Sequence, residues 1–416
     1  MNILHTSDWH LGISQDQAPR EQEHKLFLEW LLRTLVERDI DVMVHGGDTF
    51  HYMQPSARCL KQYYEFLAKC ATQTKLRQIV VTGGNHDSAS RLDAPRDILT
   101  ALDVHVVGGL SADESTWTQC LCPVRDAAGD VEAVFVAVPY VHESRLGVMA
   151  AGLGPLELKR QMVESFRALY SKLADLAQQT YPGVPIVATG HLTCYPEGQA
   201  STEGDFHTPL HLVEALGSLP PLIFDNRYSY VALGHIHKMF EIPGPNAWYA
   251  GSPVPTDIIE ARTPRYVMHV TLDGSKPEAH ASVEPIEVPT YRSIFEVHGS
   301  PDEVIERVGK LSWEEPLQPY LYVDIDVDAP MSDGLIQVEK AMEAFERGAR
   351  PRIIRYREHL LTNPDNPVLP EDMRHVPLDE LTPTQVFEKM YKIKHSVAPT
   401  PELLAAFNSL LTEATD

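Results

Sequence analysis

The sequence has few of the features that assign a protein to a class at once. Its 416 residues contain no apolar run near the roughly 18 residues of a membrane-spanning helix. The first residues have neither the basic start nor the apolar stretch of a signal peptide. There are only 5 cysteines and no Cys-x-x-Cys pair. Because disulfide frameworks need many paired cysteines, we expect reduced thiols in a cytoplasmic protein.

Positive charge is also scarce. Lys and Arg number 35 against 58 Asp and Glu, and the formal net charge is −23. Free DNA-binding domains are usually basic, because much of their affinity comes from neutralising phosphates, so composition alone argues against nucleic acid. The apolar share of 43% is enough for a sizeable core. The length suggests two or three domains of roughly 150 residues.

Residues 1–285 alternate short apolar segments with amphipathic helical patterns. This alternation predicts βαβ units with largely parallel strands, and two such sheets with outer helices would form one α/β sandwich domain. The expected strands are 2–6, 41–45, 78–82, 104–107, 131–138, 185–189, 228–233, 248–251, 266–272 and 281–285. The expected helices are 21–37, 56–71 and 156–179.

A smaller domain is expected over residues 289–360, with the order β-α-β-α-β. Its expected strands are 292–298, 320–326 and 352–356, and its expected helices are 301–311 and 332–347. A proline-rich linker, 361–383, precedes residues 384–416, which hold two amphipathic helices, 384–394 and 401–412. Tethered helices with apolar faces usually bind another molecule, although docking on the body of this chain is an alternative.

Five polar motifs stand at or just after expected strand ends. They are Asp8-Trp9-His10, Gly47-Asp48, Gly84-Asn85-His86-Asp87, Gly190-His191 and Gly234-His235-Ile236-His237. Ligands of open α/β sheets bind outside the carboxyl ends of strands, so we expect these motifs to converge. Oxygen and imidazole donors suit Mn, Fe or Zn, and the absence of thiolate argues against a structural zinc site.

The motif residues divide into two metal groups that share one carboxylate. The predicted ligands are Asp8, His10 and His237 for metal one, and Asn85, His191 and His235 for metal two, with Asp48 as the bridge. Two metals about 3.5–4 Å apart clamp a phosphoryl group and turn a water into hydroxide. His86 follows a ligand, where it would orient the phosphate or protonate the leaving oxygen.

The remaining histidines are expected to be structural. His5 and His45 fall inside strands and are expected to pack in the core. A surface position is expected for His24, His207, His211, His280, His359 and His395.

The motifs resemble those of the calcineurin-like metallophosphoesterase superfamily. The segments 3–12, Arg20-x-x-Glu23-His24 and Gly251-Ser252-Pro253 are similar to the SbcD family of bacterial nuclease subunits. This resemblance implies a four-layer α/β/β/α metallophosphoesterase sandwich, a small β-α-β-α-β cap domain and a C-terminal helical tail. It also implies a manganese-dependent DNA nuclease, a duplex-end exonuclease and single-strand and hairpin endonuclease, in DNA repair and recombination.

The same resemblance implies cofactors, site residues and partners. It implies two Mn²⁺, with Mg²⁺, Fe or Zn as alternatives, on the seven ligands named above, and catalysis by His86. His51 matches a histidine near the scissile phosphate of archaeal relatives, but some bacterial members have Asp there, and a surface-turn role stays open. Residues 289–360 would bind DNA, and residues 384–416 would bind the coiled-coil base of the SbcC ATPase.

Helix 56–71 resembles the segment through which such nucleases dimerise, which implies a homodimer within a heterotetramer; packing in the core is the alternative. Arg20, Arg91 and Lys238 flank the expected site and are candidates for DNA contacts or for plain surface residues. The expected location is cytoplasmic and nucleoid-associated, without a membrane. Because the acidity is spread over the chain, we expect weak DNA binding without the partner.

Two other functions fit the same residues. A stand-alone metallophosphoesterase acting on small phosphodiesters or nucleotides would use the same metals, but would leave the cap and tail without a role. A non-catalytic assembly subunit is the third hypothesis. The seven ligand positions are all filled by competent residues, which argues against it.

Overall fold

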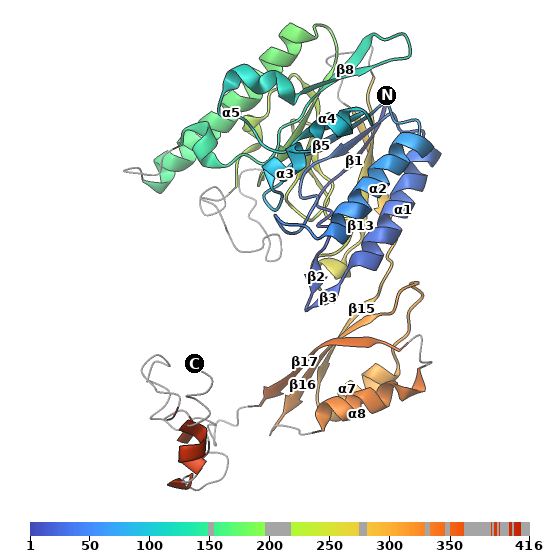
Figure 1. Cartoon of the computed structure of the whole chain (residues 1–416), viewed down its shortest axis with the longest axis vertical. Coiled ribbons are helices and arrows are strands. Elements are labelled where there is room, and N and C mark those ends of the chain that lie inside the picture. The colour runs from blue at the N-terminus through green and yellow to red at the C-terminus, as the bar shows by residue number, and fades with distance from the viewer. Residues whose placement is uncertain are drawn as a thin grey trace. The chain divides into compact units, whose positions relative to one another are not determined.

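The computed structural model describes residues 1–148, 154–195, 218–273, 281–328, 333–345, 350–361, 384, 387, 388, 391, 399–401 and 403–408. The chain divides into two compact units (Figure 1). The first comprises Met1–Phe295 and Trp313–Tyr320, and the second comprises Glu296–Ser312 and Leu321–Asp416. Within the described residues, no helix is both long enough and apolar enough to cross a membrane.

The first sheet of unit one has the strand order β14-β13-β1-β4-β5-β6. Strands β1, β4, β5 and β6 run parallel, β13 pairs antiparallel with β1, and β14 pairs antiparallel with β13. The strands are β1 (Asn2–Thr6), β4 (Val42–His45), β5 (Gln78–Thr82), β6 (Val104–Val107), β13 (Arg265–Thr271) and β14 (Ser282–Val288). A separate two-stranded ribbon joins β2 (Ser14–Gln15) to β3 (Ala18–Pro19).

The second sheet has the order β11-β12-β10-β9-β8-β7. Its inner strands are parallel, and each edge strand is antiparallel to its neighbour. The strands are β7 (Leu121–Arg125), β8 (Val131–Val136), β9 (Ile186–His191), β10 (Tyr228–Gly234), β11 (Phe240–Ile242) and β12 (Ala247–Tyr249). Parallel strands need long crossover connections, and helices supply most of them.

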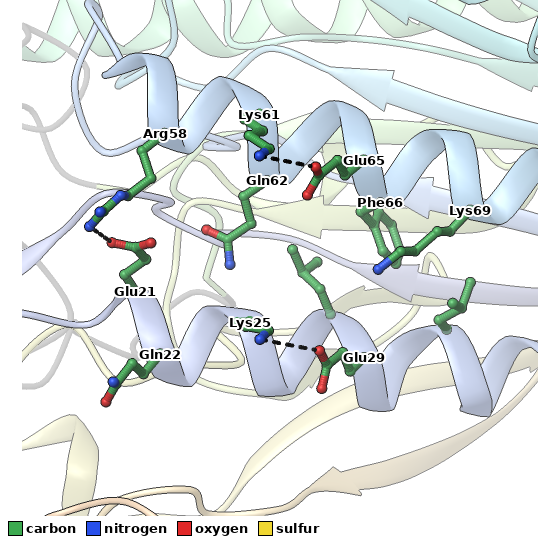
Figure 2. Close-up of a pocket in the computed structure, with 12 residues that line it drawn as sticks. Glu21, Gln22, Lys25, Glu29, Arg58, Lys61, Gln62, Glu65, Phe66 and Lys69 are labelled. Carbon is green, nitrogen blue, oxygen red and sulfur yellow. Dashed lines mark hydrogen bonds and ion pairs between the residues drawn. The ribbon is translucent and has the colours of Figure 1, made fainter.

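The helices are α1 (Glu21–Glu37), α2 (Ala57–Gln73), α3 (Ala89–Asp93), α4 (Arg96–Thr100) and α5 (Pro155–Thr180). The 3₁₀ turns of this unit are η1 (Glu114–Cys120), η2 (Glu143–Leu146), η3 (Pro221–Ile223) and η4 (Glu260–Arg262). Helices α1 and α2 lie side by side (Figure 1). Between them lies a groove of about 340 Å³, lined by the apolar Leu28, Leu32 and Phe66 and by charged side chains, among them Lys25, Glu29, Lys61 and Glu65 (Figure 2).

Alternate residues of the first sheet enter two different hydrophobic cores. Ile3 and Val80 join the core that contains the second sheet and α5, whereas Leu4 and Ile79 join the core under α1 and α2. Successive strand residues point to opposite faces, so the first sheet is covered by helices on one side and by a sheet on the other. The predicted four-layer α/β/β/α sandwich is therefore confirmed.

Both histidines that were expected in the core lie there. His5 and His45 are 0% and 1% exposed, which confirms the predicted core positions. His24 is also 0% exposed, so the predicted surface position is wrong. Position 24 falls on the same stripe of α1 as Phe27 and Leu31, three and seven residues on, and this stripe faces the core.

The other histidines that were expected at the surface are only partly described. His359 is exposed, as expected. His207, His211, His280 and His395 lie outside the described residues.

The cysteines are all buried and free. In helix α2, Tyr63 and Leu67 are 2% and 0% exposed, so part of the expected dimer face packs in the core.

The second unit contains a three-stranded sheet in the order β15-β16-β17. Its elements follow the expected β-α-β-α-β order, and α7 packs on α8. They are β15 (Ile294–Gly299), α7 (Pro301–Gly309), β16 (Tyr320–Val327), α8 (Gly334–Ala341), η5 (Met342–Ala344) and β17 (Arg352–Leu360). A capping box of Ser300 and Glu303 begins α7.

The linker 361–383 lies outside the described residues beyond position 361. The two expected tail helices are described only in part, at 384, 387, 388 and 391 and at 401 and 403–408. Among these, the rings of Phe387 and Phe407 stack with their centroids 4.0 Å apart, and Thr384 Oγ1 donates to Asn408 Oδ1 at 2.6 Å. The two tail segments therefore contact each other.

Candidate metal centre

The predicted ligands all follow the carboxyl ends of strands. Strands β1, β4 and β5 of the first sheet lead to Asp8 and His10, to Asp48 and to Asn85. Strands β9 and β10 of the second sheet end at His191 and lead to His235 and His237. Parallel strands have their carboxyl ends at one edge, so the first sheet supplies four of the seven ligands and the second sheet three.

The backbone of this region is unusual. Asp8, His10, Asp48 and His235 have positive φ angles of 52°, 46°, 54° and 92°. Such conformations cost non-glycine residues energy and gather at functional sites. Hydrogen bonds support them, because Asp8 N–H donates to Gly47 O at 2.9 Å and His235 N–H donates to Asp8 Oδ1 at 2.9 Å.

One group of donors contains Asp8, His10 and His237. One ligand atom of each lies within 4.8 Å of the other two. The Nε2 atoms of His10 and His237 face each other at 3.0 Å. Asp8 is 0% and His10 is 1% exposed. Two buried imidazoles and a carboxylate that point at one spot are a competent set of ligands for a divalent transition metal.

A second group meets at Asn85. Its Oδ1 lies 2.9 Å from His191 Nε2 and 3.0 Å from His235 Nδ1. The outer nitrogen of His191, Nδ1, lies 2.8 Å from Gly46 O. This contact to a backbone carbonyl assigns the proton to Nδ1 and directs Nε2 towards Asn85.

Asp48 stands between the two groups. Its Oδ2 lies 3.5 Å from His10 Nε2 and 3.4 Å from His191 Nε2. Burial alone would raise the pKa of Asp48, but the charge and hydrogen bond of His191, together with His10, hold this pKa well below its usual range. Its other oxygen, Oδ1, accepts the N–H of His86 at 2.8 Å. An ionised carboxylate shared in this way fits a bridge between two metals.

The imidazoles differ in their protonation. Burial lowers the pKa of His10 well below its usual value, despite the opposing charge of Asp48. Burial also acts on His191 and His237, but Asp48 raises the pKa of His191 to about 9 and Glu260 raises that of His237 to about 9. A metal at these two rings must therefore displace a proton.

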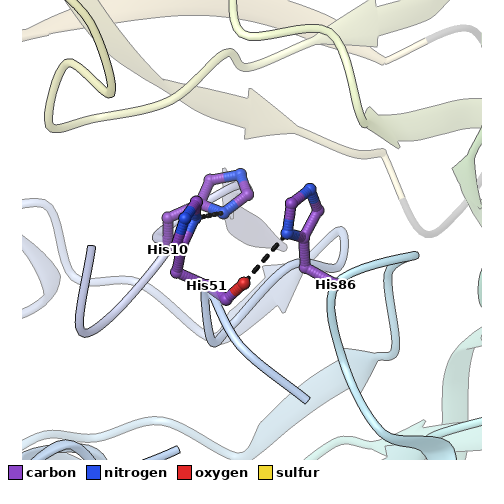
Figure 3. Close-up of side chains that lie close together, drawn as sticks. All are labelled: His10, His51 and His86. Carbon is purple, nitrogen blue, oxygen red and sulfur yellow. Dashed lines mark hydrogen bonds between the residues drawn. The ribbon is translucent and has the colours of Figure 1, made fainter. Parts of the chain in front are cut away.

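His86 and His51 lie at the half-buried edge of the cluster (Figure 3). Their rings stack with centroids 5.3 Å apart and an interplanar angle of 22°. His86 Nδ1 donates to His51 O at 2.9 Å, and His51 Nδ1 lies 3.3 Å from His10 Nδ1. The structure therefore brings both histidines to the donor groups.

Two carboxylates that the sequence did not mark as functional support the cluster. Asp87 accepts the N–H groups of Thr49, Phe50 and Gly84 at 3.1, 3.0 and 2.9 Å. The position of Asp87 at the end of the Gly84–Asp87 motif is the sequence feature that could have indicated this role. Glu260 Oε1 lies 2.6 Å from His237 Nδ1, and nothing in its own segment indicates this role.

The three cations that were candidates for DNA contacts differ in their exposure. Arg20 is 1% exposed and donates to Glu23 Oε1 at 2.5 Å and to Gln15 Oε1 at 2.6 Å. The expectation that Arg20 contacts DNA is therefore wrong, because its guanidinium is enclosed and paired. Arg91 and Lys238 are exposed and stay predictions.

Comparison with known proteins assigns the family. The family described as Calcineurin-like phosphoesterase matches residues 1–239. The SbcD subunit of the SbcCD nuclease from Rhodobacter capsulatus is 30% identical over 83% of this chain and 85% of its own length. The protein of the same name from Escherichia coli K12 is 31% identical over 79% and 78%. The chain belongs to the SbcD family of calcineurin-like phosphoesterases. It is thus a metal-dependent phosphodiester hydrolase.

Solved structures add less to this SbcD-family assignment. The protein TT1561 of Thermus thermophilus aligns with 69% of this chain and 99% of its own, at 12% identity and a TM-score of 0.36. This likeness is too small to carry an argument.

Proposed function

We propose that the chain is a two-metal DNA nuclease subunit. It cleaves phosphodiesters as a duplex-end exonuclease and as an endonuclease on single strands and hairpins, in DNA repair and recombination. The convergence of seven oxygen and nitrogen donors from two sheets around Asp48 supports this proposal most strongly. The family name of the relatives, nuclease, supports the choice of a nucleic-acid substrate.

The donor set fits two divalent ions. The proposed ligands are Asp8, His10 and His237 for metal one, Asn85, His191 and His235 for metal two, and Asp48 for both. Mn²⁺ is the proposed ion, and Mg²⁺, Fe and Zn are the alternatives for mixed oxygen and imidazole donors. When bound, the pair supplies a hydroxide at neutral pH and polarises the phosphoryl oxygens.

The residues at the edge of the site supply positioning and a proton. His86 Nδ1 is bonded to His51 O, which leaves Nε2 as the nitrogen of His86 that faces substrate. We assign to the doubly protonated ring of His86 the donation of the Nε2 proton to the leaving oxygen, which leaves the ring neutral with its remaining proton on Nδ1; such a role typically contributes about 10²–10⁴-fold. His51 holds the His86 ring through its carbonyl and its stacked imidazole.

The charge of the chain favours a partner that grips DNA. With a net charge of −23 and Arg20 enclosed, the isolated chain is expected to bind DNA weakly and with strong salt dependence. The proposed partner is the SbcC ATPase, whose coiled-coil base would bind residues 384–416. Residues 289–360 would act as a DNA-binding cap, in a homodimer within a heterotetramer associated with the nucleoid.

The test compares DNA with a small substrate. The full chain with Mn²⁺ is assayed on duplex and hairpin DNA and on bis(p-nitrophenyl) phosphate. His86→Gln should lose at least about 100-fold on DNA and still bind two metals, whereas the control His142→Gln, at an exposed position, should keep full activity. Full activity of His86→Gln would refute its role. Faster turnover of the small diester than of DNA would favour the stand-alone phosphoesterase.

A further inference from the structure

Behind one imidazole of the metal centre lies a carboxylate from a separate segment. Glu260 belongs to η4 (Glu260–Arg262), is 7% exposed and places Oε1 2.6 Å from His237 Nδ1. We infer that Glu260 is a positioning residue, which holds the His237 ring so that Nε2 faces metal one. This inference rests on the proposed two-metal function and adds a residue to it.

The contact determines which nitrogen of His237 is free. A carboxylate beside Nδ1 accepts its proton in a hydrogen bond, so Nε2 carries the lone pair that a metal needs. Nε2 of His237 is the atom that lies 3.0 Å from His10 Nε2. The ring is therefore held from one side and presents its ligand atom on the other.

Glu260 is itself held firmly. Its Oε2 accepts the N–H of Thr256 at 2.8 Å and its Oε1 accepts the Thr256 hydroxyl at 2.8 Å. Its own N–H donates to Asp257 Oδ1 at 2.8 Å. A carboxylate with two such bonds, on a residue whose backbone is held by a third, keeps its orientation when the ring of His237 moves, so the restraint acts on the ring.

Arg265 extends the support to the backbone. Its guanidinium donates from Nη1 to His237 O at 2.5 Å and from Nη2 to Glu260 O, and Nη2 lies 3.6 Å from Glu260 Oε2. Arg265 begins β13 and is 8% exposed. The ligand and its positioning residue are thus joined through their carbonyls to one buried cation.

The other imidazoles have different supports. His191 Nδ1 contacts the carbonyl of Gly46 at 2.8 Å, His10 Nδ1 faces His51 Nδ1 at 3.3 Å, and His235 uses Nδ1 towards Asn85. Among the contacts described for these four rings, the one between a carboxylate and the nitrogen that faces away from the cluster is that of Glu260 with His237. Loss of Glu260 should therefore weaken metal one and leave metal two unchanged.

The experiment measures metal binding by the full, metal-stripped chain. Mn²⁺ is titrated by calorimetry, and the bound ions are counted by elemental analysis. Glu260→Ala should bind one ion as the wild type does and the other about 10–100-fold more weakly. Glu260→Gln keeps an oxygen that accepts from Nδ1, and should recover part of that loss. In a His237→Ala background, Glu260→Ala should cause no further loss.

A matched control separates positioning from general destabilisation. Glu23 is a second buried carboxylate, 2% exposed and paired with Arg20 and Arg292. Glu23→Gln should lower the unfolding temperature yet bind both ions at full affinity. Binding of both ions at wild-type affinity by Glu260→Ala would overturn the inference alone. A wild-type chain that binds no second ion would overturn the proposed function and this inference with it.

Discussion

The buried His5 allows a prediction that can be worked out in kcal/mol. Its Nδ1 accepts from the Tyr230 hydroxyl at 2.8 Å and its Nε2 donates to Leu233 O at 3.1 Å, so the ring ties the first sheet to the second. His5→Leu leaves both groups buried without this partner. At about 1–3 kcal/mol for each such group, we expect a loss of about 3 kcal/mol in the free energy of unfolding at pH 7.5.

The same substitution should cost less in acid. Burial lowers the pKa of His5 to about 3, so the folded protein keeps the ring neutral while the unfolded chain takes up a proton near pH 6.5. A histidine whose pKa is lower in the folded protein than in the unfolded chain stabilises the fold at pH values above about 6.5. This stability is lost progressively as the pH falls towards 3. From pH 7.5 to 5.5 this loss is about 1.4 kcal/mol, and only the wild type suffers it.

Urea denaturation of the metal-stripped chain at both pH values tests this reasoning. The difference between wild type and His5→Leu should shrink from about 3 to about 1.6 kcal/mol between pH 7.5 and 5.5. Val44→Ala, which shortens a buried apolar side chain on the neighbouring strand, is the control and should lower the free energy of unfolding equally at both pH values. A difference between wild type and His5→Leu that stays constant or grows in acid would refute the argument.

Three further predictions concern the metal centre. Asp87→Ala removes the acceptor of three backbone N–H groups and should cost about 3–6 kcal/mol of unfolding free energy, visible in urea denaturation; wild-type stability would contradict this. Gly84→Ala places a Cβ 2.0 Å from Asp48 Oδ1 and should abolish binding of both ions, seen by elemental analysis; two bound ions would disprove it. Because the pKa values of His191 and His237 are raised to about 9, binding two Mn²⁺ at pH 7.5 should release about two protons from these rings, in addition to the proton of the water that becomes hydroxide. Calorimetry in buffers of different ionisation enthalpy counts them, and binding without proton release would speak against the raised values.

The parts of the site that the sequence predicts are local. Asp8 and Asp48 come directly after apolar strands. Because a parallel sheet brings the carboxyl ends of its strands together, this position in the sequence predicts that both side chains lie in the site. The helix bounds of α1, 21–37, agree with the prediction for the same reason, since a continuous apolar stripe defines the helix. Both inferences need only neighbours in the sequence.

The parts that the sequence did not predict depend on distant segments. The sequence predicts Arg20 as a surface cation, but its side chain is buried and paired with Glu23. Glu23 also pairs with Arg292, which lies 272 residues after Arg20 in the chain. Glu260 supports His237 from 23 positions further along the chain. The positive φ angles of Asp8, His10 and Asp48 also have no local signal, because glycine is the residue that usually adopts such conformations. Tertiary packing overrides local preference at these positions.

The origin of the ligands in both sheets has a consequence for biosynthesis. The donors of metal one extend from Asp8 to His237, and the residue behind His237 is Glu260. A growing chain on the ribosome has its first sheet partly made long before β10 emerges, so no complete site exists until most of unit one has been synthesised and its two sheets have docked. Contacts of such long range form late in folding. A site with all seven ligands in place therefore reports that the two sheets have docked.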